Sequence, residues 1–481
     1  MGRPNILILM SDEHARRVMG AYGDDIVQTP NLDRLAAQSM VFDAAYTPSP
    51  ICVPARAAIA TGKPIHETGH WDNAHPYEGT PESWGHVLAR EGYRVESIGK
   101  LHYRGTDADT GFAKQTLPMH VTGGIGDLTG SIRTPPPLRA GSRKLAERLG
   151  PGESDYTRYD RAVRDAAITR LELAAATGED GLVLLVSFVA PHFPLIAPKE
   201  FYDLYADVPL APRMSHPDKA AQHPWLKALR NSYAYDNFDD EKRTRALRSY
   251  YGLVSFLDDN IGAVLGALES SGRAPDTSVL YFSDHGDNLG ERGMWGKSTF
   301  FEDSVGVPLM IRPARSFTPR RVTTPVSLTD IHATLLDIAD TEKTGIGESL
   351  LPLVDGSDAG RAVLSQYHAA GAPTGAYMLR RGSFKLIHYD GYPPQLFNLS
   401  EDPFERTNLA GSPEAASDLQ RLTRCLFDLL DPAATSRQAL SAQSELLRKH
   451  GGSNQIQNRD SGFSGTPVPN ARLQRTWPGK S

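Results

Sequence analysis

Cys52 and Arg56 are the first two residues whose types and spacing point to chemistry. They lie in the stretch I-C-V-P-A-R, which an alanine-rich run follows as far as Gly62. Proline suits the first position of a helix and glycine its end, so Pro54 and Gly62 predict a short helix with Cys52 at its N-terminus. Arg56, four residues on, falls on the same face as Cys52. A sulfur or its derivative beside a fork-shaped cation and a helix N-terminus is a suitable seat for a tetrahedral oxyanion.

Polar side chains of catalytic types follow four strand-like runs elsewhere in the chain. The apolar runs at 6–10, 181–188 and 278–282 are typical of strands buried on both faces of a parallel sheet, and 94–99 is the fourth run, a short strand. In open α/β sheets, ligands bind beyond the carboxyl ends of such strands. We therefore expect one cluster beside the cysteine helix, made of Asp12, Lys100, His102, His192, Asp284 and His285.

Three members of this cluster favour a hard divalent cation. Asp12, Asp284 and His285 form an oxygen-rich set, and carboxylates suit Ca²⁺, Mg²⁺ or Mn²⁺, whereas a closed zinc site has more histidine or cysteine. We expect one divalent ion, with Ca²⁺ as the first choice.

The elements that must position these residues alternate along the first 355 residues. Strand-like runs alternate with helical periodicity at 31–40, 82–91, 156–176, 241–268 and 329–336. This alternation predicts an α/β domain over 1–355, with a large, mostly parallel sheet flanked by helices. Asn31 is the expected cap of the first of these helices. The irregular stretch 106–154 predicts a functional lid or a mobile loop.

The pattern changes after residue 355. Short strands at 361–368, 375–381 and 383–388, with a helix near 413–430, predict a smaller C-terminal α+β domain over 356–435 with a short antiparallel sheet. The tail 436–481 has a weak pattern and many Ser, Gln and Asn residues. We expect it to contact a neighbouring subunit.

Composition excludes several classes of partner. The net charge of −6 over 481 residues gives no footprint for nucleic acid or for an anionic membrane. No run approaches the ~18 apolar residues of a spanning helix. The two cysteines, Cys52 and Cys425, do not form a disulfide framework. The N-terminus lacks the pattern of a secretory signal, so we expect a cytoplasmic protein.

The stretch C-V-P-A-R followed by A-A-I-A-T-G-K resembles the signature of type I sulfatases of the alkaline phosphatase superfamily. The segments W-D-N, I-G-K-L-H, S-D-H-G-D-N-L-G-E-R-G-M-W-G-K and F-E-D-S-V-G-V-P-L resemble the choline sulfatase and phosphonate monoester hydrolase branch. The resemblance runs from Asn5 to about Leu409. It implies an alkaline phosphatase-like fold and a maturation enzyme that oxidises Cys52 to formylglycine, whose hydrate is the nucleophile. By the same resemblance, the metal ligands are Asp12, Cys52 as formylglycine, Asp284 and His285, and the sulfate pocket contains Arg56, Asn73, Lys100, His102, His192 and Lys297.

Two features depart from that family pattern. Many sulfatases have a second aspartate where this chain has Glu13, and the choline and phosphonate branch often has an amide there, so we leave Glu13 outside the metal set. Choline sulfatases hold the trimethylammonium group in an aromatic cage with an acidic partner. This chain has no tryptophan between Trp84 and Trp225, and the stretch H-A-A-G-A-P from His368 contains no carboxylate. Choline is therefore not the expected substrate.

The sequence leaves three functions open. The first is hydrolysis of a small aryl or alkyl sulfate monoester to alcohol and inorganic sulfate. The second is hydrolysis of phosphonate monoesters or phosphodiesters by the same site, because sulfate and phosphoryl groups are both tetrahedral oxyanions. The third is a non-catalytic protein that binds sulfated ligands. Relatives of this kind often form dimers or tetramers, so we expect a homo-oligomer.

Overall fold

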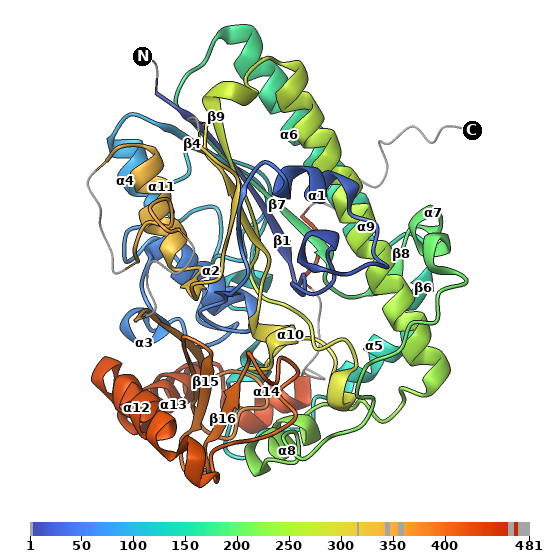
Figure 1. Cartoon of the computed structure of the whole chain (residues 1–481), viewed down its shortest axis with the longest axis vertical. Coiled ribbons are helices and arrows are strands. Elements are labelled where there is room, and N and C mark those ends of the chain that lie inside the picture. Colours follow the sequence, from blue (N-terminus) through green and yellow to red (C-terminus); the bar gives the residue numbers. More distant parts are fainter. Residues whose placement is uncertain (1–2, 315–316, 342–346, 355–359, 460–465, 470–481) are drawn as a thin grey trace.

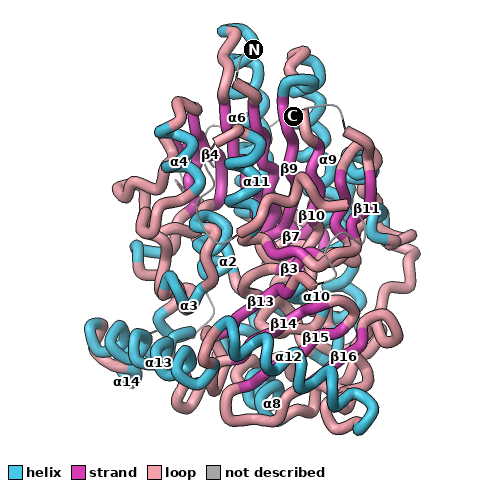
Figure 2. Tube along the Cα trace, turned by 60° about the vertical axis from the view of Figure 1, so that its left-hand side comes forward, coloured by secondary structure: helices cyan, strands magenta, loops and turns pink. Residues whose placement is uncertain are grey.

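The computed structural model describes residues 3–314, 317–341, 347–354, 360–459 and 466–469. The strands of its main sheet, in spatial order, are β11 (Arg320–Val322), β2 (Met40–Phe42), β10 (Leu309–Arg312), β9 (Thr277–Ser283), β1 (Asn5–Asp12), β7 (Leu182–Pro191), β4 (Arg94–Lys100) and β5 (Lys114–Met119). All neighbours are parallel except that β10 is antiparallel to β9 and to β2. The predicted α/β class with a mostly parallel sheet is confirmed (Figures 1 and 2).

Helices cover both faces of this sheet, and the alternation of side chains along β1 explains why. Leu7 and Leu9 pack into one buried cluster, with residues of α1 (Pro30–Ala36), α6 (Asp155–Thr177) and α9 (Asp240–Ser270). Ile6 and Ile8 point the other way, into a second cluster with residues of α2 (Cys52–Thr61), α4 (Trp84–Arg90) and α11 (Asp330–Ile338). Successive strand residues face opposite sides, so a central strand with a core on each side must be apolar throughout. Figure 1 shows α6 and α9 on one side of the strands and α4 and α11 on the other.

A second, smaller sheet lies in the C-terminal region (Figure 2). It is antiparallel, in the order β13 (Ala362–Tyr367), β14 (Ala376–Arg381), β15 (Phe384–Tyr389) and β16 (Gln395–Asn398). The helices that follow are α12 (Ala416–Leu429), α13 (Pro432–Lys449) and α14 (Ser453–Arg459). The predicted small antiparallel sheet is confirmed. The predicted division at 435/436 falls inside α13, and that helix buries Gln443 against its own chain.

The first predicted helix is shorter than expected and capped differently. It ends at Ala36, and Met40 already belongs to β2. Asn31 lies inside α1, so it is not the cap. The carboxylate of Asp258 on α9 accepts the N–H groups of Asn31 and Leu32 at 3.2 and 2.7 Å. A distant side chain therefore supplies the cap, which local sequence cannot reveal.

The stretch 106–154 is more regular than predicted. It contributes β5 to the edge of the main sheet and also contains α5 (Lys144–Glu147) and β6 (Leu149–Pro151), which pairs with β8 (Leu195–Ala197). Part of the expected lid is thus a sheet edge. The remaining short elements are β3 (Ala45–Tyr46), β12 (Val326–Ser327), α3 (Ile65–Thr68), α7 (Lys199–Tyr202), α8 (Pro224–Asn231) and α10 (Glu302–Val305).

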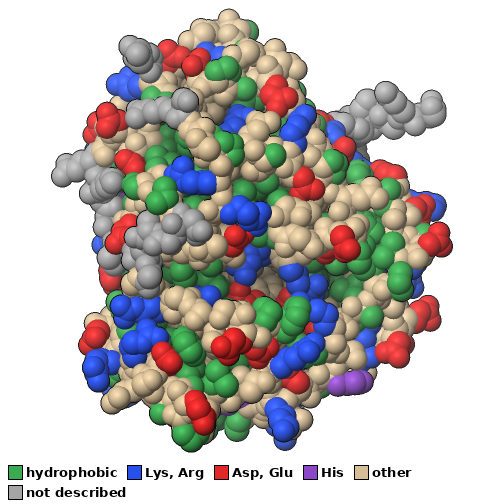
Figure 3. Space-filling model, in the orientation of Figure 1, with side chains coloured by type: hydrophobic (Ala, Val, Ile, Leu, Met, Phe, Trp, Pro, Cys, Tyr) green, Lys and Arg blue, Asp and Glu red, His purple; other side chains and the backbone are tan. Residues whose placement is uncertain are grey.

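Within the described residues, no helix is both long and apolar enough to cross a membrane. On the face in Figure 3, acidic and basic side chains are interspersed with apolar ones, and several basic side chains lie around the central hollow.

A buried cluster of charges joins the small sheet to the main domain. Lys385 of β15 has no exposed surface, and its Nζ lies 2.8 Å from Glu302 Oε1 and 2.5 Å from Glu405 Oε1. The other oxygen of Glu302 accepts a bond of 2.6 Å from Arg16. Burial alone would lower the pKa of Lys385, but the two carboxylates raise it, so the ammonium stays charged. The cluster is balanced only while the lysine is present.

Replacing Lys385 with methionine is expected to lower the free energy of unfolding by about 3 kcal/mol, because it removes the buried cation that pairs with both Glu302 and Glu405. Urea unfolding followed by circular dichroism measures the change. The matched control is Lys449→Met, which removes a lysine paired with Glu445 on an exposed surface and should cost below about 1 kcal/mol. Equal losses of unfolding free energy in the two variants would mean that the buried charge cluster contributes no more to stability than an exposed ion pair.

Candidate active site

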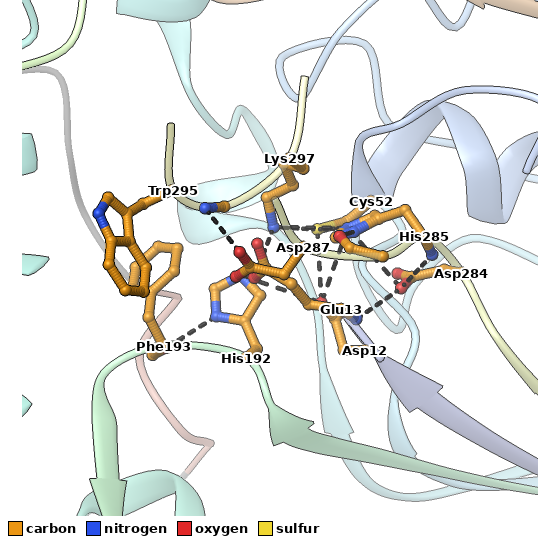
Figure 4. Close-up of polar contacts among 12 residues, drawn as sticks. Asp12, Glu13, Cys52, His192, Phe193, Asp284, His285, Asp287, Trp295 and Lys297 are labelled. Atoms are coloured by element: carbon orange, nitrogen blue, oxygen red, sulfur yellow. Dashed lines mark hydrogen bonds and ion pairs between the residues drawn. The ribbon is translucent and has the colours of Figure 1, made fainter. Parts of the chain in front are cut away.

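Four adjacent strands, β9, β1, β7 and β4, deliver polar side chains at their carboxyl ends. Asp12 is the last residue of β1 and Lys100 the last of β4, while His192 follows β7 and Asp284 follows β9. Because these strands are parallel neighbours, their carboxyl ends meet at one edge of the sheet. Lys100 Nζ lies 2.6 Å from Asp12 Oδ2. Figure 4 shows Asp12, His192 and Asp284 converging around Cys52.

Cys52 is brought to this edge by α2. The chain is extended at Ile51, and Cys52 is the first helical residue, two positions earlier than predicted from Pro54. The Oδ1 atom of Asn73 accepts the Val53 N–H at 3.1 Å, which satisfies one free donor of the first turn. The helix is rich in alanine and wholly buried, so it packs closely while presenting the cysteine at its N-terminus.

The environment of Cys52 keeps the sulfur protonated. Its side chain is only 1% exposed. Burial, and next the nearby Asp12 carboxylate, raises the pKa of the thiol above its ordinary value. The thiolate is the nucleophilic form of cysteine. An unmodified Cys52 is therefore a poor nucleophile at neutral pH, although it stands at the centre of the site.

Four buried side chains point ligand atoms at one place. Cys52 Sγ lies 3.1 Å from His285 Nε2 and 3.8 Å from Asp12 Oδ1, and His285 Nε2 lies 3.7 Å from Asp284 Oδ1. All four ligand atoms fall within 4.8 Å of one another. His285 Nδ1 lies 3.0 Å from the Gly286 carbonyl, which only accepts, so Nδ1 carries the hydrogen and Nε2 offers its lone pair. This is the predicted metal set.

Arg56 lies behind the carboxylates, not on the wall of the pocket where the sequence put it. Its Nε donates to Asp284 Oδ2 at 2.8 Å and its Nη2 to Asp12 Oδ2 at 3.0 Å. Its Nη1 donates to the Lys100 carbonyl and to Ser187 Oγ. Arg56 therefore uses the Oδ2 atom of each carboxylate and leaves the Oδ1 atoms to the set around Cys52. Its position is that of a support for the two aspartates.

The other predicted residues lie together around one pocket beside Cys52. Lys297 reaches the centre, with its Nζ 3.2 Å from Cys52 Sγ and 3.4 Å from His285 Nε2. The predicted residues that line the pocket are Cys52, Asn73, Lys100, His102, His192 and Lys297. Two lysines facing one small space give it a strong preference for an anion.

His192 is held in a defined orientation. Its Nδ1 lies 2.7 Å from the Phe193 carbonyl and therefore carries a hydrogen, while its Nε2 lies 3.3 Å from Glu13 Oε2. Burial, and next the charge of Lys297, lowers the pKa of His192 well below its ordinary value. Without a ligand the imidazole is thus neutral. An anion bound between the lysines would offset their charge and favour its protonation.

Two carboxylates near the site were not assigned a role from the sequence. Glu13, left outside the metal set, lines the pocket with Oε2 3.2 Å from Lys297, and its ligand atom also groups with those of Asp12 and His192. Burial raises the pKa of Glu13 to about 8. Its place directly after β1 was the available signal. Asp160 of α6 accepts the N–H groups of Val189 and Ala190, both at 2.8 Å, and so fixes the end of β7 that carries His192. Nothing local in the sequence marks it.

The outer wall of the pocket is aromatic. The sequence argued against an aromatic cage because the stretch 106–154 lacks tryptophan, and that stretch indeed contributes no aromatic ring to the pocket. Other segments supply the rings, namely Tyr156, Phe193, Tyr233, Tyr235 and Trp295. Arg139 and Asp127 form an ion pair of 2.6 Å in the same wall. The pocket therefore joins a cationic floor to a wall suited to a flat or apolar group.

Comparisons with known proteins show which family the chain is similar to. A model of the sulfatase family matches residues 4–341, more than half of the chain, and a model of the C-terminal part of N-sulphoglucosamine sulphohydrolase matches residues 290–431. A choline-sulfatase of Rhizobium meliloti (strain 1021) is 34% identical over 443 residues, covering 88% of this chain and 85% of the relative. Arylsulfatase K of Danio rerio is 30% identical over 453 residues, covering 89% and 84%.

Solved structures show the same fold. The phosphonate monoester hydrolase SpPMH of Silicibacter pomeroyi superimposes with a TM-score of 0.74 at 24% identity, covering 89% of this chain and 95% of the other. The phosphonate monoester hydrolase of Agrobacterium radiobacter gives a TM-score of 0.72 at 23% identity, with the same coverage. The family match, together with the sulfatase relatives, identifies the chain as a member of the sulfatase family, a hydrolase of sulfuric esters.

Proposed function

We propose that this protein hydrolyses small aryl or alkyl sulfate monoesters to the alcohol and inorganic sulfate, with Cys52 oxidised to formylglycine and one divalent ion bound beside it. The observation that carries the proposal is the place of Cys52. Its sulfur is at once 3.1 Å from a metal-type histidine nitrogen and 3.2 Å from Lys297, at the floor of the pocket. A derivative of this side chain would meet both a cation and a bound anion.

The residues present fit a divalent ion. The four ligand atoms converge, and Arg56 engages only the Oδ2 atoms of Asp12 and Asp284. Two carboxylates and one imidazole, with an oxygen of an oxidised Cys52, form a mainly oxygen donor set, which favours Ca²⁺ and also suits Mg²⁺ or Mn²⁺. Such an ion would withdraw charge from the sulfate oxygens, and the formylglycine hydrate would supply one oxygen to attack sulfur and a second hydroxyl to release it.

The chain's own residues account for the remaining tasks. Lys100 and Lys297 would hold the sulfate and offset charge that builds on its oxygens. His192 would protonate the leaving oxygen, since its Nε2 faces the pocket beside Lys297 and its other nitrogen is engaged by Phe193. His102 would take the proton of the second hydroxyl. Asn73 would hold the first turn of α2 and thus the position of residue 52.

A panel of matched substrates tests the proposal. Nitrophenyl sulfate, a nitrophenyl phosphonate monoester, bis-nitrophenyl phosphate and choline sulfate are compared by kcat/KM. We expect the sulfate esters to lead. Aromatic rings can contact a flat aryl group or a trimethylammonium group, so the panel ranks the aryl ester against choline sulfate. A preference for the phosphonate or the diester would establish the alternative function, which the fold of the phosphonate monoester hydrolases supports. Binding of sulfate esters without turnover of any substrate would indicate a non-catalytic protein.

His192→Ala is expected to slow substrates with poor leaving groups by about 10²–10³-fold but nitrophenyl sulfate by less than about tenfold, because only a basic leaving oxygen needs a proton. The measurement is kcat/KM against leaving-group pKa for a series of aryl and alkyl sulfates. His120→Ala, which changes a histidine outside the pocket lining, is the control. A uniform loss across the series would remove the acid role from His192.

Three further expectations accompany the proposal and remain predictions. They are a formylglycine-generating maturation enzyme as a partner, assembly into a homodimer or homotetramer, and a cytoplasmic location. Mass spectrometry of the Cys52 peptide, light scattering and cell fractionation would measure them in turn.

A further inference from the structure

The described segment 466–469 returns to the active site from the far end of the chain. Thr466 Oγ1 lies 2.7 Å from His102 Nε2, across 364 residues of sequence. Tyr156 Oη donates to the Thr466 carbonyl, also at 2.7 Å. Val468 packs against the buried cluster on the α6 and α9 face of the sheet. Two hydrogen bonds and an apolar contact therefore place this segment beside the pocket, and Thr466 lines it.

The orientation of the His102 ring depends on its contact with Thr466. Its Nδ1 is buried and has no hydrogen-bond partner among the described residues. Its backbone has a left-handed φ of 56°, with the N–H bonded to the Met119 carbonyl, so the main chain is fixed but the ring is not. The Thr466 hydroxyl is thus the one side-chain or backbone group in the described structure that engages the imidazole by a hydrogen bond.

We propose that Thr466 is a positioning residue for His102 and thereby an integral part of the catalytic pocket. The inference rests on the proposed function, in which His102 accepts a proton. A threonine hydroxyl rotates and can either donate to a neutral Nε2 or accept from a protonated one. When Nε2 carries a hydrogen and donates it to Oγ1, this bond persists in the neutral and in the protonated ring, and Nδ1 is then the nitrogen that gains and loses the proton.

The position of the contact explains why a hydroxyl is useful there. Burial, and next the charges of Lys100 and Arg56, lowers the pKa of His102 well below its ordinary value. A fixed cationic donor at Nε2 would oppose protonation further, and a carboxylate would hold the ring permanently charged. A neutral hydroxyl orients the ring without adding charge to a pocket that must bind an anion.

The test uses the full-length, matured enzyme and whichever substrate of the panel it turns over. Thr466→Val, which keeps the shape but removes the hydroxyl, is expected to lower kcat about tenfold with KM changed less than about twofold, because one hydrogen bond to the ring is lost. Thr466→Ser restores a hydroxyl and should retain most of kcat. Thermal unfolding should show the same Tm in both variants. The kcat–pH profile of Thr466→Val should also be altered relative to wild type, which a loss of packing alone would not produce.

A double-mutant cycle isolates the contact. In a His102→Ala background, Thr466→Val should cost nothing further, since the ring that it positions is already absent. A kcat of Thr466→Val within twofold of wild type, equal losses for valine and serine, or full additivity with His102→Ala would each overturn the proposal. Failure of the proposed function is distinct, because it appears in the wild-type enzyme as a different leading substrate or as no turnover.

Discussion

Cys52→Ala is expected to lose sulfate ester hydrolysis by a factor of about 10⁴ or more, because it removes the side chain that oxidation would convert into the nucleophile. The fold should survive. The change deletes one buried sulfur from a helix that already consists largely of alanine, at a cost of about 1 kcal/mol. The measurement is kcat/KM with nitrophenyl sulfate, accompanied by circular dichroism and Tm.

Cys425→Ala is the matched control for this variant. Cys425 is the other cysteine of the chain and lies half-buried on α12, so its replacement should leave activity unchanged. A mass spectrum of the peptide containing residue 52, from protein made with the maturation enzyme, completes the experiment. An aldehyde that a hydrazine reagent traps would establish the nucleophile. Wild-type rates from Cys52→Ala would remove the mechanism altogether.

Loss of the divalent ion is expected to lower kcat/KM by about 10³-fold, because the site would lose its strongest stabilisation of charge on the sulfate oxygens. Dialysis against a chelator should produce this loss, and Ca²⁺, Mg²⁺ or Mn²⁺ added back should rank in their ability to restore activity. Asp284→Asn should have a comparable effect without dialysis, since an amide keeps the shape of the side chain but carries no charge. Calorimetry with Ca²⁺ measures binding directly.

Asp258→Asn is the control for the aspartate variant. Asp258 is also buried, but it belongs to α9, caps the N-terminus of α1 and lies outside the ligand set. It should lower stability without lowering activity at a temperature where the variant is folded. Full activity after exhaustive chelation, or equal activities for the two asparagine variants, would show that the Asp284 carboxylate does not hold a catalytic ion.

The part of the site that the sequence could predict is the part that the parallel strands impose. A strand buried on both faces must be apolar along its length, so β1, β7 and β9 can be identified in the sequence as apolar runs. The polar residues that follow each run can then be recognised as well. β5 was not predicted, because an edge strand with the sequence K-Q-T-L-P-M has no continuous apolar run. α13 was not predicted as a helix, because the side chains that it buries are polar or small, such as Gln443 and Ala439. Its periodicity is not one of large apolar residues.

Arg56 and Thr466 show two different limits of reasoning from sequence. The i, i+4 spacing correctly placed Arg56 near Cys52, but it could not tell which surface that face of α2 would meet. Two fully buried carboxylates, Asp12 and Asp284, need a cation nearby, and the Arg56 guanidinium pairs with them instead of facing the substrate. Thr466 touches His102 from 364 positions away, and no spacing rule connects them. Contacts of this kind belong to the tertiary fold alone.

The burial of Cys52 turns its oxidation into a matter of timing. An enzyme that modifies a side chain must reach it, and here all residues of the helix that carries Cys52 are buried in the folded chain. Segments in the centre of a core open only with a free energy close to that of global unfolding. We therefore expect the proposed oxidation to precede folding, and a chain that folds before it is oxidised to retain the Cys52 thiol. The fraction of chains that carry the oxidised side chain would then depend on the rate of oxidation relative to the rate of folding.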